Sequence, residues 1–238
     1  MDNLPTRSKP TIIATLAKRL RSLGSIFAEP RPVFQRVRVA MIDLETFDTE
    51  PTAAFYAIGA RMFTFGESPD DSTLDADYPL WDAAAIARHN DFLQYIDPQQ
   101  MLADTRFTSS EDTMRWTMEK NLVEFRRAQD HGKDATLVLD LFDEWLAHHK
   151  PEFIVSNSPN FDHSILRHAY RVMERSTPLP PFRTDFDVRT IGHLRHLTGM
   201  KRYPTKGKNL RVHSPLDDCT SQISWISGFV RYIETGEM

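Results

Sequence analysis

The sequence predicts an α/β domain with a mixed β-sheet and helices on its faces. Two observations predict it: apolar segments of strand type come first along the chain, and strand-type segments then alternate with helix-type segments. The chain has 238 residues, of which 40% are hydrophobic and 26% charged. That length and composition suit one large domain with a buried core, alone or with a small appendage.

The expected elements follow from the spacing of apolar residues. Runs rich in Val, Ile, Met and aromatic residues favour strands. These runs are 37–42, 55–65, 92–96 and 153–155. Apolar residues that recur every three or four positions favour helices, and Ser109 or Ser110 is a suitable cap for the first of them. The predicted helices run from that cap through 116, over 135–149, 162–173 and 188–197, and from about 214 to 233.

Residues 1–35 differ from the rest and are predicted to be an extension that precedes a domain at 36–238. Four prolines punctuate the extension, and apolar residues between 11 and 27 lie at roughly helical spacing. Residues 1–40 hold eight basic and two acidic groups. Three interpretations stay open: an arm that binds nucleic acid or a protein partner, an organelle transit peptide, or a segment without a function of its own.

Charge and cysteine content narrow the class of protein. The formal net charge of −4 argues against simple phosphate binding, but an acidic body suits a metal-dependent nuclease, because its carboxylates collect cations that then meet phosphates. The single cysteine, Cys219, excludes an intrachain disulfide and a cysteine-rich zinc site and favours a cytoplasmic location. No apolar run approaches the roughly 18 residues of a membrane span, so we expect no membrane partner.

Three acidic residues stand at positions where some nearby group or ion has to stabilise the negative charge. Asp43 and Glu45 lie two residues apart on the first predicted strand, so their side chains point to the same side and repel unless a cation lies between them. A solvated strand end is the alternative. Asp162 follows a turn with Asn160 as the expected helix cap, and the helix dipole alone would also explain an acid there.

A fourth pattern surrounds the start of the last predicted helix. Ser214 is a good cap and Pro215 a good first helical residue. His213 would then stand just before the helix and Asp218 one turn into it, so that both reach the same point. Asp217 should point away as a first-turn charge.

In this order, the motifs resemble the DEDDh 3′→5′ exonuclease superfamily, which has an RNase H-like mixed sheet flanked by helices. Within it, the chain is most similar to phage and bacterial single-domain exonucleases related to T-even phage exonuclease A and mycobacterial RNase AS. The matching segments are 41–46, 112–116, 157, 161–162, 165–167, 187–190, 213 and 216–218. The sequence departs from the group at Phe47 and Asp48, where glycine is common, and at Pro215, which replaces a small residue.

The resemblance implies hydrolysis of phosphodiester bonds with two Mg²⁺ or Mn²⁺ ions, which prefer oxygen ligands. Asp43 would bridge both ions, Glu45 and Asp218 would complete the first ion's site, and Asp162 would hold the second ion. His213 would take the proton from the attacking water, and nucleoside 5′-monophosphates would leave.

The resemblance also implies that the 3′ end of single-stranded nucleic acid is bound beside the first strand. The residues assigned to substrate binding are Leu44, Thr46, Phe47, Trp116 and Asn157. Core packing is the alternative for each aromatic residue. Single-stranded DNA is favoured over RNA, although the likeness to RNase AS and oligoribonuclease points to RNA. A homodimer is expected, because many relatives are dimers. The alternative function is a catalytically silent nucleic-acid-binding module.

Overall fold

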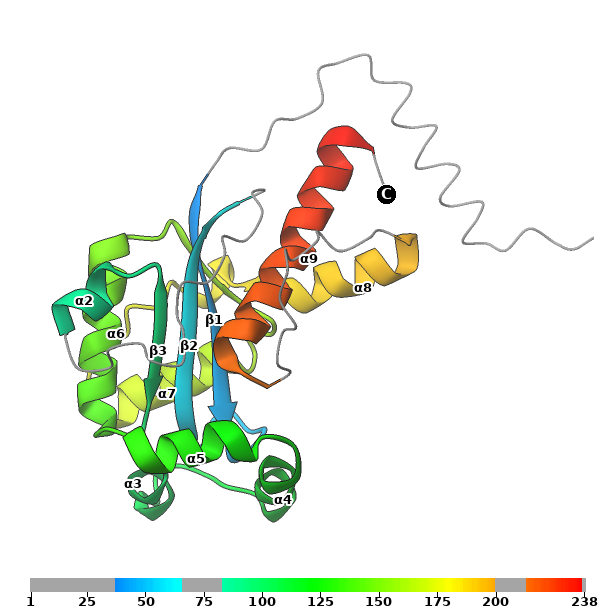
Figure 1. Cartoon of the computed structure of the whole chain (residues 1–238). Helices are drawn as coiled ribbons and strands as arrows, with labels where there is room; N and C mark the ends of the chain where they lie inside the picture. Colours follow the sequence, from blue (N-terminus) through cyan, green and yellow to red (C-terminus); the bar gives the residue numbers. More distant parts are fainter. Residues whose placement is uncertain (1–36, 66–82, 200–212, 237–238) are drawn as a thin grey trace, which may run out of the picture.

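A five-stranded mixed sheet forms the centre of the protein (Figure 1). The computed structural model describes residues 37–65, 83–199 and 213–236, so the predicted extension at 1–35 lies outside the described residues. The strands are β1 (Arg38–Thr46), β2 (Phe55–Thr64), β3 (Asp91–Tyr95), β4 (Phe153–Ser156) and β5 (Phe186–Asp187). Their order across the sheet is β3-β2-β1-β4-β5. Neighbouring pairs are antiparallel from β3 to β1 and parallel from β1 to β5, which confirms the predicted mixed sheet.

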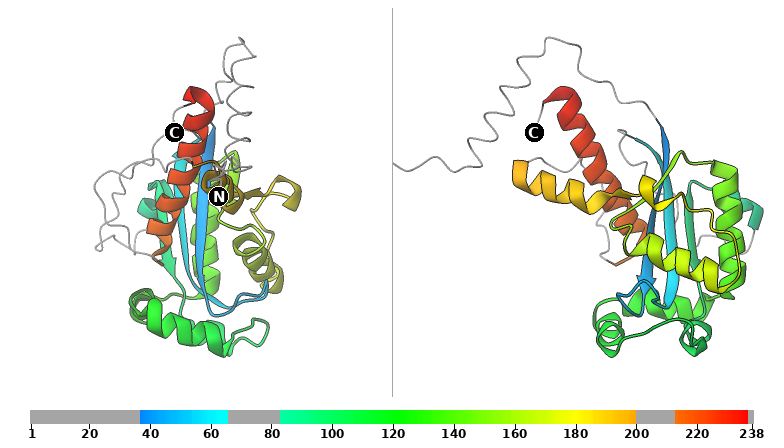
Figure 2. Two further views of the ribbon diagram at one scale, coloured as in Figure 1. Left: turned by 90° about the vertical axis from the view of Figure 1, so that its right-hand side faces the viewer. Right: turned by 180° about the vertical axis from the view of Figure 1, so that it is seen from behind.

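Helices cover both faces of this sheet. They are α2 (Ala83–Arg88), α3 (Pro98–Ala103), α4 (Glu111–Lys120), α5 (Leu122–His131), α6 (Ala135–His149), α7 (Asp162–Val172), α8 (Val188–Thr198) and α9 (Pro215–Thr235), with a short 3-10 turn at Phe182–Thr184. In the two views of Figure 2, α7 and α9 lie on opposite sides of the strands. None of the helices in the described part of the chain is long and apolar enough to cross a membrane.

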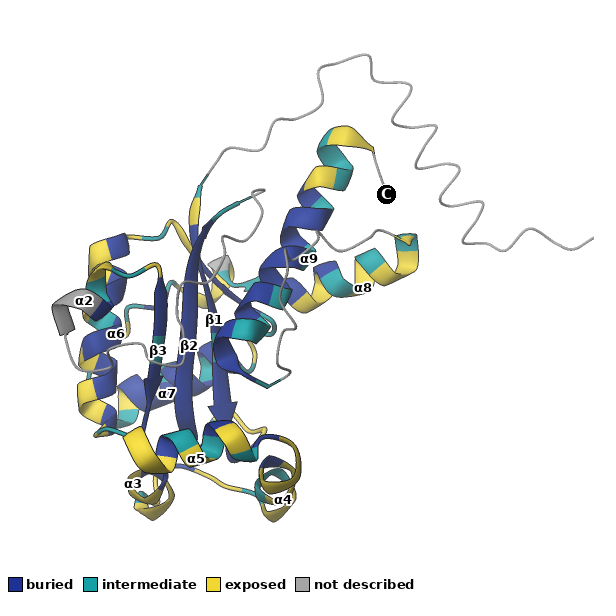
Figure 3. Cartoon of the chain, viewed as in Figure 1, coloured by how far each residue is buried: buried dark blue, intermediate teal, exposed yellow. Residues whose placement is uncertain are grey.

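The central strand β1 divides its side chains between two cores, as the two-residue period of a strand requires. Ala40, Ile42 and Leu44 join the larger core with α6 and α7. Val39 and Met41 join a smaller core with α8 and α9. The strands and the inner sides of α6 and α9 are buried, whereas α3 and α4 expose most of their residues (Figure 3). The next residues of β1 on the side that faces α9 are therefore Asp43 and Glu45, the two acids that the sequence analysis singled out.

The first turn of α9 is fixed on the sheet by a close approach and a buried ion pair. A β-carbon at Gly59 of β2 would lie 2.3 Å from Pro215 Cβ, so only glycine allows the helix to rest on the strand. Nearby, Arg61 pairs with Asp91 at 2.7 Å and also donates to Thr220 on α9, all in the protein interior. These contacts set how far the helix start lies from β1.

The observed elements differ from the predicted ones in detail. The strand β1 runs on to Thr46, so its acids lie within the strand and not at its end. The helix α7 starts at Asp162 as predicted, but Phe161 holds the cap position and no side chain caps it, so the predicted Asn160 cap is wrong. The prediction that the last helix starts after Ser214 with Pro215 at its first position is confirmed.

Candidate active site

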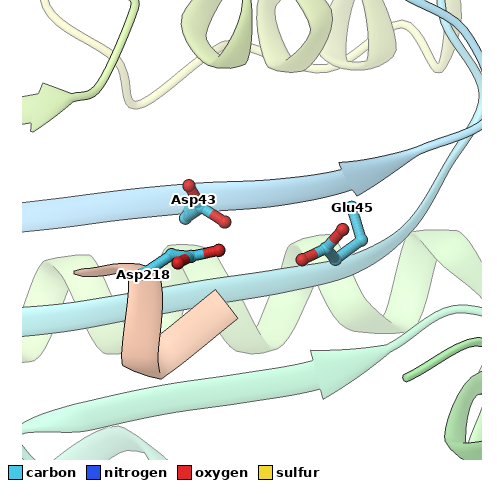
Figure 4. Close-up of side chains that lie close together, drawn as sticks. All are labelled: Asp43, Glu45 and Asp218. Atoms are coloured by element: carbon cyan, nitrogen blue, oxygen red, sulfur yellow. The ribbon is translucent and has the colours of Figure 1, made fainter. Parts of the chain in front are cut away.

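Three carboxylates converge at the edge of the smaller core. Asp43 and Glu45 project from β1, and Asp218 projects from the first turn of α9 toward them (Figure 4). One ligand oxygen from each of the three lies within 4.8 Å of the others. The two-residue period of β1 and the docking of α9 on Gly59 together produce this arrangement. It is a spacing at which one cation could contact all three side chains.

Two amide side chains hold these acids in place. Gln222, one turn after Asp218 on α9, donates from Nε2 to Asp43 Oδ1 at 2.9 Å. Asn121, between α4 and α5, donates from Nδ2 to Glu45 Oε2 at 2.7 Å and to the Tyr56 hydroxyl at 3.0 Å. The sequence analysis missed both amides. The spacing of four residues from Asp218 could have indicated Gln222, because residues i and i+4 share a helix face.

The electrostatics of the cluster oppose full ionisation. Burial raises the pKa of Asp43 well above its usual value, and the charges of Asp162 and Asp218 raise it further. Burial likewise raises the pKa of Glu45, with a smaller effect from Asp43 and Asp218. The pKa of Asp218 is raised to about 6 by burial. No Lys or Arg in the described part of the chain comes within ion-pair distance of these acids, so a cation from outside would stabilise their charged forms.

Asp162 approaches the cluster from the other side of β1. Its Oδ1 accepts a hydrogen bond from the backbone N–H of Leu44 at 3.2 Å, and burial raises its pKa to about 6. Its charge reaches Asp43, but its oxygens stand outside the group of three and it does not line the cleft in this structure. The structure therefore brings Asp43, Glu45 and Asp218 together, with Asp162 adjacent.

His213 stands at the entrance to α9 in a left-handed backbone conformation, with φ of 64°. That conformation is costly for a residue with a side chain, and the bond from its N–H to Asp218 Oδ2 at 3.0 Å offsets part of the cost. Its ring stands edge-on to the Trp116 ring, with centroids 4.5 Å apart. Partial burial lowers the pKa of His213, which keeps the imidazole neutral near pH 7.

A cleft of about 620 Å³ opens over the acids. Four of the five residues predicted to bind substrate line it: Leu44, Thr46, Trp116 and Asn157. The sequence did not single out four further residues of its wall: Thr49, Ser221, Gln222 and Trp225.

The prediction that Phe47 contacts substrate is wrong in this structure. Phe47 is fully buried and packs against Tyr56 and Phe125 in the larger core. Strict alternation would place it on the same face as Glu45. A register shift between Glu45 and Thr46 turns the following residue to the opposite face, as a β-bulge does.

The donor set of the cluster fits a divalent cation. It offers carboxylate oxygens, which Mg²⁺ and Mn²⁺ prefer, and its only cysteine neighbour, Cys219, is buried with its thiol directed at the Met41 carbonyl. The Oε1 atom of Gln222 is also buried and without a hydrogen-bond partner in the described part of the chain. A bound cation or its water could satisfy this buried amide oxygen, which lies beside three carboxylates.

Comparison with known proteins decides the family. The model of the 3′-5′ exoribonuclease Rv2179c-like domain matches residues 38–230, which is most of the chain. The chain belongs to this family. The predicted resemblance to 3′→5′ exonucleases is confirmed at this level, since residues 38–230 form a domain of a 3′-5′ exoribonuclease family. No curated protein matches the sequence.

Solved structures show the same fold at low sequence identity. Cell-death related nuclease 4 (CRN-4) is 16% identical, with a TM-score of 0.50 over 84% of this chain and 65% of its own. Exonuclease I of E. coli in complex with a dA13 oligonucleotide is 12% identical, with a TM-score of 0.53 over 82% of this chain and 40% of its own. The chain thus spans less than two thirds of the length of either protein. The predicted RNase H-like fold is confirmed.

Proposed function

We propose that this domain removes nucleoside 5′-monophosphates one at a time from the 3′ end of single-stranded RNA. The observation that carries the proposal is the group of three carboxylates from β1 and α9, at one cleft of a domain in an exoribonuclease family. The sequence analysis favoured DNA over RNA. The description of the matched family favours RNA, and DNA becomes the second arm of the test.

The acids would hold two Mg²⁺ or Mn²⁺ ions, with Asp43, Glu45 and Asp218 as one group of ligands and Asp162 as the ligand nearest the second ion. When bound, such ions supply charge neutralisation at the attacked phosphate and a nucleophile from water at neutral pH. The hydrogen bonds of Gln222 and Asn121 would keep Asp43 and Glu45 directed at the cleft.

His213 would act as the general base. Because burial lowers its pKa, the imidazole is unprotonated near pH 7 and has a nitrogen lone pair that can accept a proton. The bond from its backbone N–H to Asp218 fixes the backbone of His213 relative to the acids. Contact with the Trp116 ring limits its rotation. These restraints would hold a ring nitrogen toward a water molecule at the acids.

Leu44 and Thr46 would bind the terminal nucleotide, since they line the cleft on either side of Glu45. Trp116 is 39% exposed and would stack on a base at this end of the cleft, while Asn157 would contact the sugar or phosphate. From the family resemblance we also propose a homodimer, which sedimentation equilibrium would detect as twice the chain mass.

The test uses 5′-labelled RNA and DNA dodecamers of one sequence, each incubated with the full chain and Mg²⁺ or Mn²⁺. A ladder that shortens by one nucleotide from the 3′ end, with free 5′-monophosphates, is the expected result, and it should form faster on RNA. In Asp43→Asn we expect kcat to fall at least about a thousandfold, since loss of a metal ligand removes several kcal/mol of transition-state stabilisation.

Asp130→Asn is the matched control. Asp130 lies on α5, is exposed, and does not line the cleft, so its variant removes the same charge without touching the acids. It should cut at the wild-type rate. If neither strand shortens with either metal, the exonuclease proposal fails. If DNA shortens faster than RNA, the proposal of an RNA substrate is wrong and the exonuclease activity stands.

A further inference from the structure

The cleft continues along α9 beyond the acids. Asp218, Gln222 and Trp225 all line it, and they succeed one another by about one helical turn. Trp225 follows Asp218 by seven positions of helix, which corresponds to about 10 Å along the axis. The cleft therefore has a wall on the far side of the acids from Thr46 and Trp116, with an indole at its end.

The indole of Trp225 lies directly on α8. A β-carbon at Gly192 would come within 3.2 Å of two atoms of the Trp225 ring, so glycine at this position lets the ring approach the helix backbone. The Arg195 guanidinium carbon lies 6.0 Å from the centroid of the same ring. Trp225 is only partly buried and keeps part of its surface at the cleft. Two turns of α8 thus hold the ring in a fixed orientation.

The helix α8 also meets the cleft at its first turn. The N–H of Arg189 donates to the carbonyl of Asn157 at 2.9 Å, and Asn157 lines the cleft. From there α8 runs away from the sheet beside α9 (Figure 1). Helix α8 therefore contacts the wall of the cleft at two residues, Asn157 and Trp225.

The charge of α8 is opposite to that of the chain as a whole. The helix carries two arginines and two histidines and has no acidic residue between Val188 and Thr198, whereas the chain has a net charge of −4. The Arg189 side chain is exposed. Arg195 has a buried Nε without a hydrogen-bond partner among the described residues. Cationic groups beside an aromatic ring suit a nucleic-acid strand, whose phosphates and bases alternate.

We propose that Trp225, Arg195 and Arg189 form an upstream subsite for the nucleotides that precede the one being removed. Trp225 stacks on a base, and the two arginines bind backbone phosphates as the strand leaves along α8. This inference rests on the proposed function, because it takes the terminal nucleotide to lie on the Thr46 side of the acids. The strand then has to pass the acids toward Trp225.

The subsite predicts that affinity depends on strand length. A nitrophenyl ester of a nucleoside 5′-monophosphate presents one nucleotide to the acids and none to the subsite. An RNA octamer reaches both. In wild-type protein, the octamer should therefore have a KM at least tenfold lower than an RNA dimer, because stacking and phosphate contacts add to its binding.

The experiment measures kcat and KM for the ester, the dimer and the octamer in Trp225→Leu, Trp225→Phe and Arg189→Gln. Trp225→Leu should raise the octamer KM about tenfold or more relative to the ester KM, and Trp225→Phe should recover most of that loss because a ring remains. Arg189→Gln should make the dependence of log KM on log salt shallower by about 0.7 for the octamer.

Arg126→Gln on α5 is the control, since it removes an exposed arginine that does not line the cleft. It should leave all three substrates at wild-type values. If Trp225→Leu lowers turnover of the ester and the octamer by the same factor, Trp225 only supports the fold and the subsite is refuted. If wild-type protein turns over neither ester nor RNA, the proposed function itself fails.

Discussion

Two groups of carboxylates in this protein, each buried or half-buried, have opposite electrostatic surroundings. In the first, the acidic cluster of Asp43, Glu45, Asp162 and Asp218, each side chain has a raised pKa. In the second, Asp91 and Asp185 each lie against an arginine. Asp91 receives two hydrogen bonds from Arg61, and Asp185 receives two from Arg167 and one from His163.

The difference lies in the partners and not in the depth of burial. Asp91 is 4% exposed and Glu45 is 7% exposed, yet only Asp91 has a guanidinium beside it. For Asp185, the bonds from Arg167 and His163 outweigh the effect of burial and lower the pKa. A buried acid without a cation costs free energy, so under the proposed function a bound cation would stabilise the acidic cluster. The comparison separates carboxylates that have a cationic partner within the described part of the chain from those that have none.

The largest effect should come from breaking a paired carboxylate. Asp91→Asn leaves Arg61 buried without its counter-charge, and we expect the free energy of unfolding in urea to fall by about 3–5 kcal/mol. The double variant Arg61→Met with Asp91→Leu should recover most of this loss, because no unpaired charge remains. A loss below about 1 kcal/mol in Asp91→Asn would show that the pair does not hold the fold.

In the acidic cluster, removal of one carboxylate charge should raise the free energy of unfolding and not lower it. The pKa of Asp162 is raised to about 6, whereas an aspartate in an unfolded chain has a pKa of about 3.9. Between these values the folded protein binds more protons than the unfolded chain, so rising pH favours unfolding. In chelator at pH 8, Asp162→Asn should therefore be more stable than wild type, by on the order of 2 kcal/mol.

At pH 4.5 this advantage should largely vanish, because Asp162 is then protonated in the folded protein. Addition of Mn²⁺ at pH 8 should reverse the order, since only the wild type keeps all four acids. Urea unfolding at both pH values, with chelator and with Mn²⁺, gives the four free energies. Greater stability of wild type than of Asp162→Asn in chelator at pH 8 would contradict the argument.

A smaller effect is expected at the amide that orients the cluster. Gln222→Met removes the hydrogen bond to Asp43 but keeps the length of the side chain. Loss of such an orienting contact typically weakens metal binding by about 10–100-fold. Calorimetric titration with Mn²⁺ measures it directly, without reference to catalysis. Gln129→Met, at an exposed position of α5, should bind as wild type does.

The smallest effect belongs to Asp134, an exposed carboxylate that caps a helix and also accepts a hydrogen bond from Gln100. Asp134 accepts hydrogen bonds from the N–H groups of Thr136 and Leu137 at the start of α6. Asp134→Ala should cost about 1 kcal/mol of unfolding free energy in urea and leave the Mn²⁺ titration unchanged. An altered metal affinity in this variant would contradict the assignment of metal binding to the acidic cluster alone.

The sequence predicted the long, periodic elements and missed the short or irregular ones. The bounds of α6 were predicted to the residue, because its apolar positions repeat over four turns without interruption. The helix α5 was missed, since it follows α4 after a single residue and four of its ten residues are charged. The strand β5 has two residues, too few for any periodic signal.

The same limit applies to the site. The acids and His213 stand in local motifs, so residue spacing indicated them, and the structure brings Asp43, Glu45 and Asp218 together. Asn121 and Trp225 reach the site only through tertiary packing and carry no local signal. Phe47 was misassigned because the period of a strand cannot be extended across a bulge that the sequence does not mark.

Gly59 sets the distance between the two chain segments that carry the acids. It pairs with Asp43 across the sheet and lies beneath Pro215, so one added methyl group would push the start of α9 outward. Asp218 and Gln222 would move with the helix, and both would then lie farther from Asp43. The spacing of the acidic oxygens thus depends on a residue that has no functional group. Natural variation that silences this domain is to be sought at Gly59 as much as at the acids themselves.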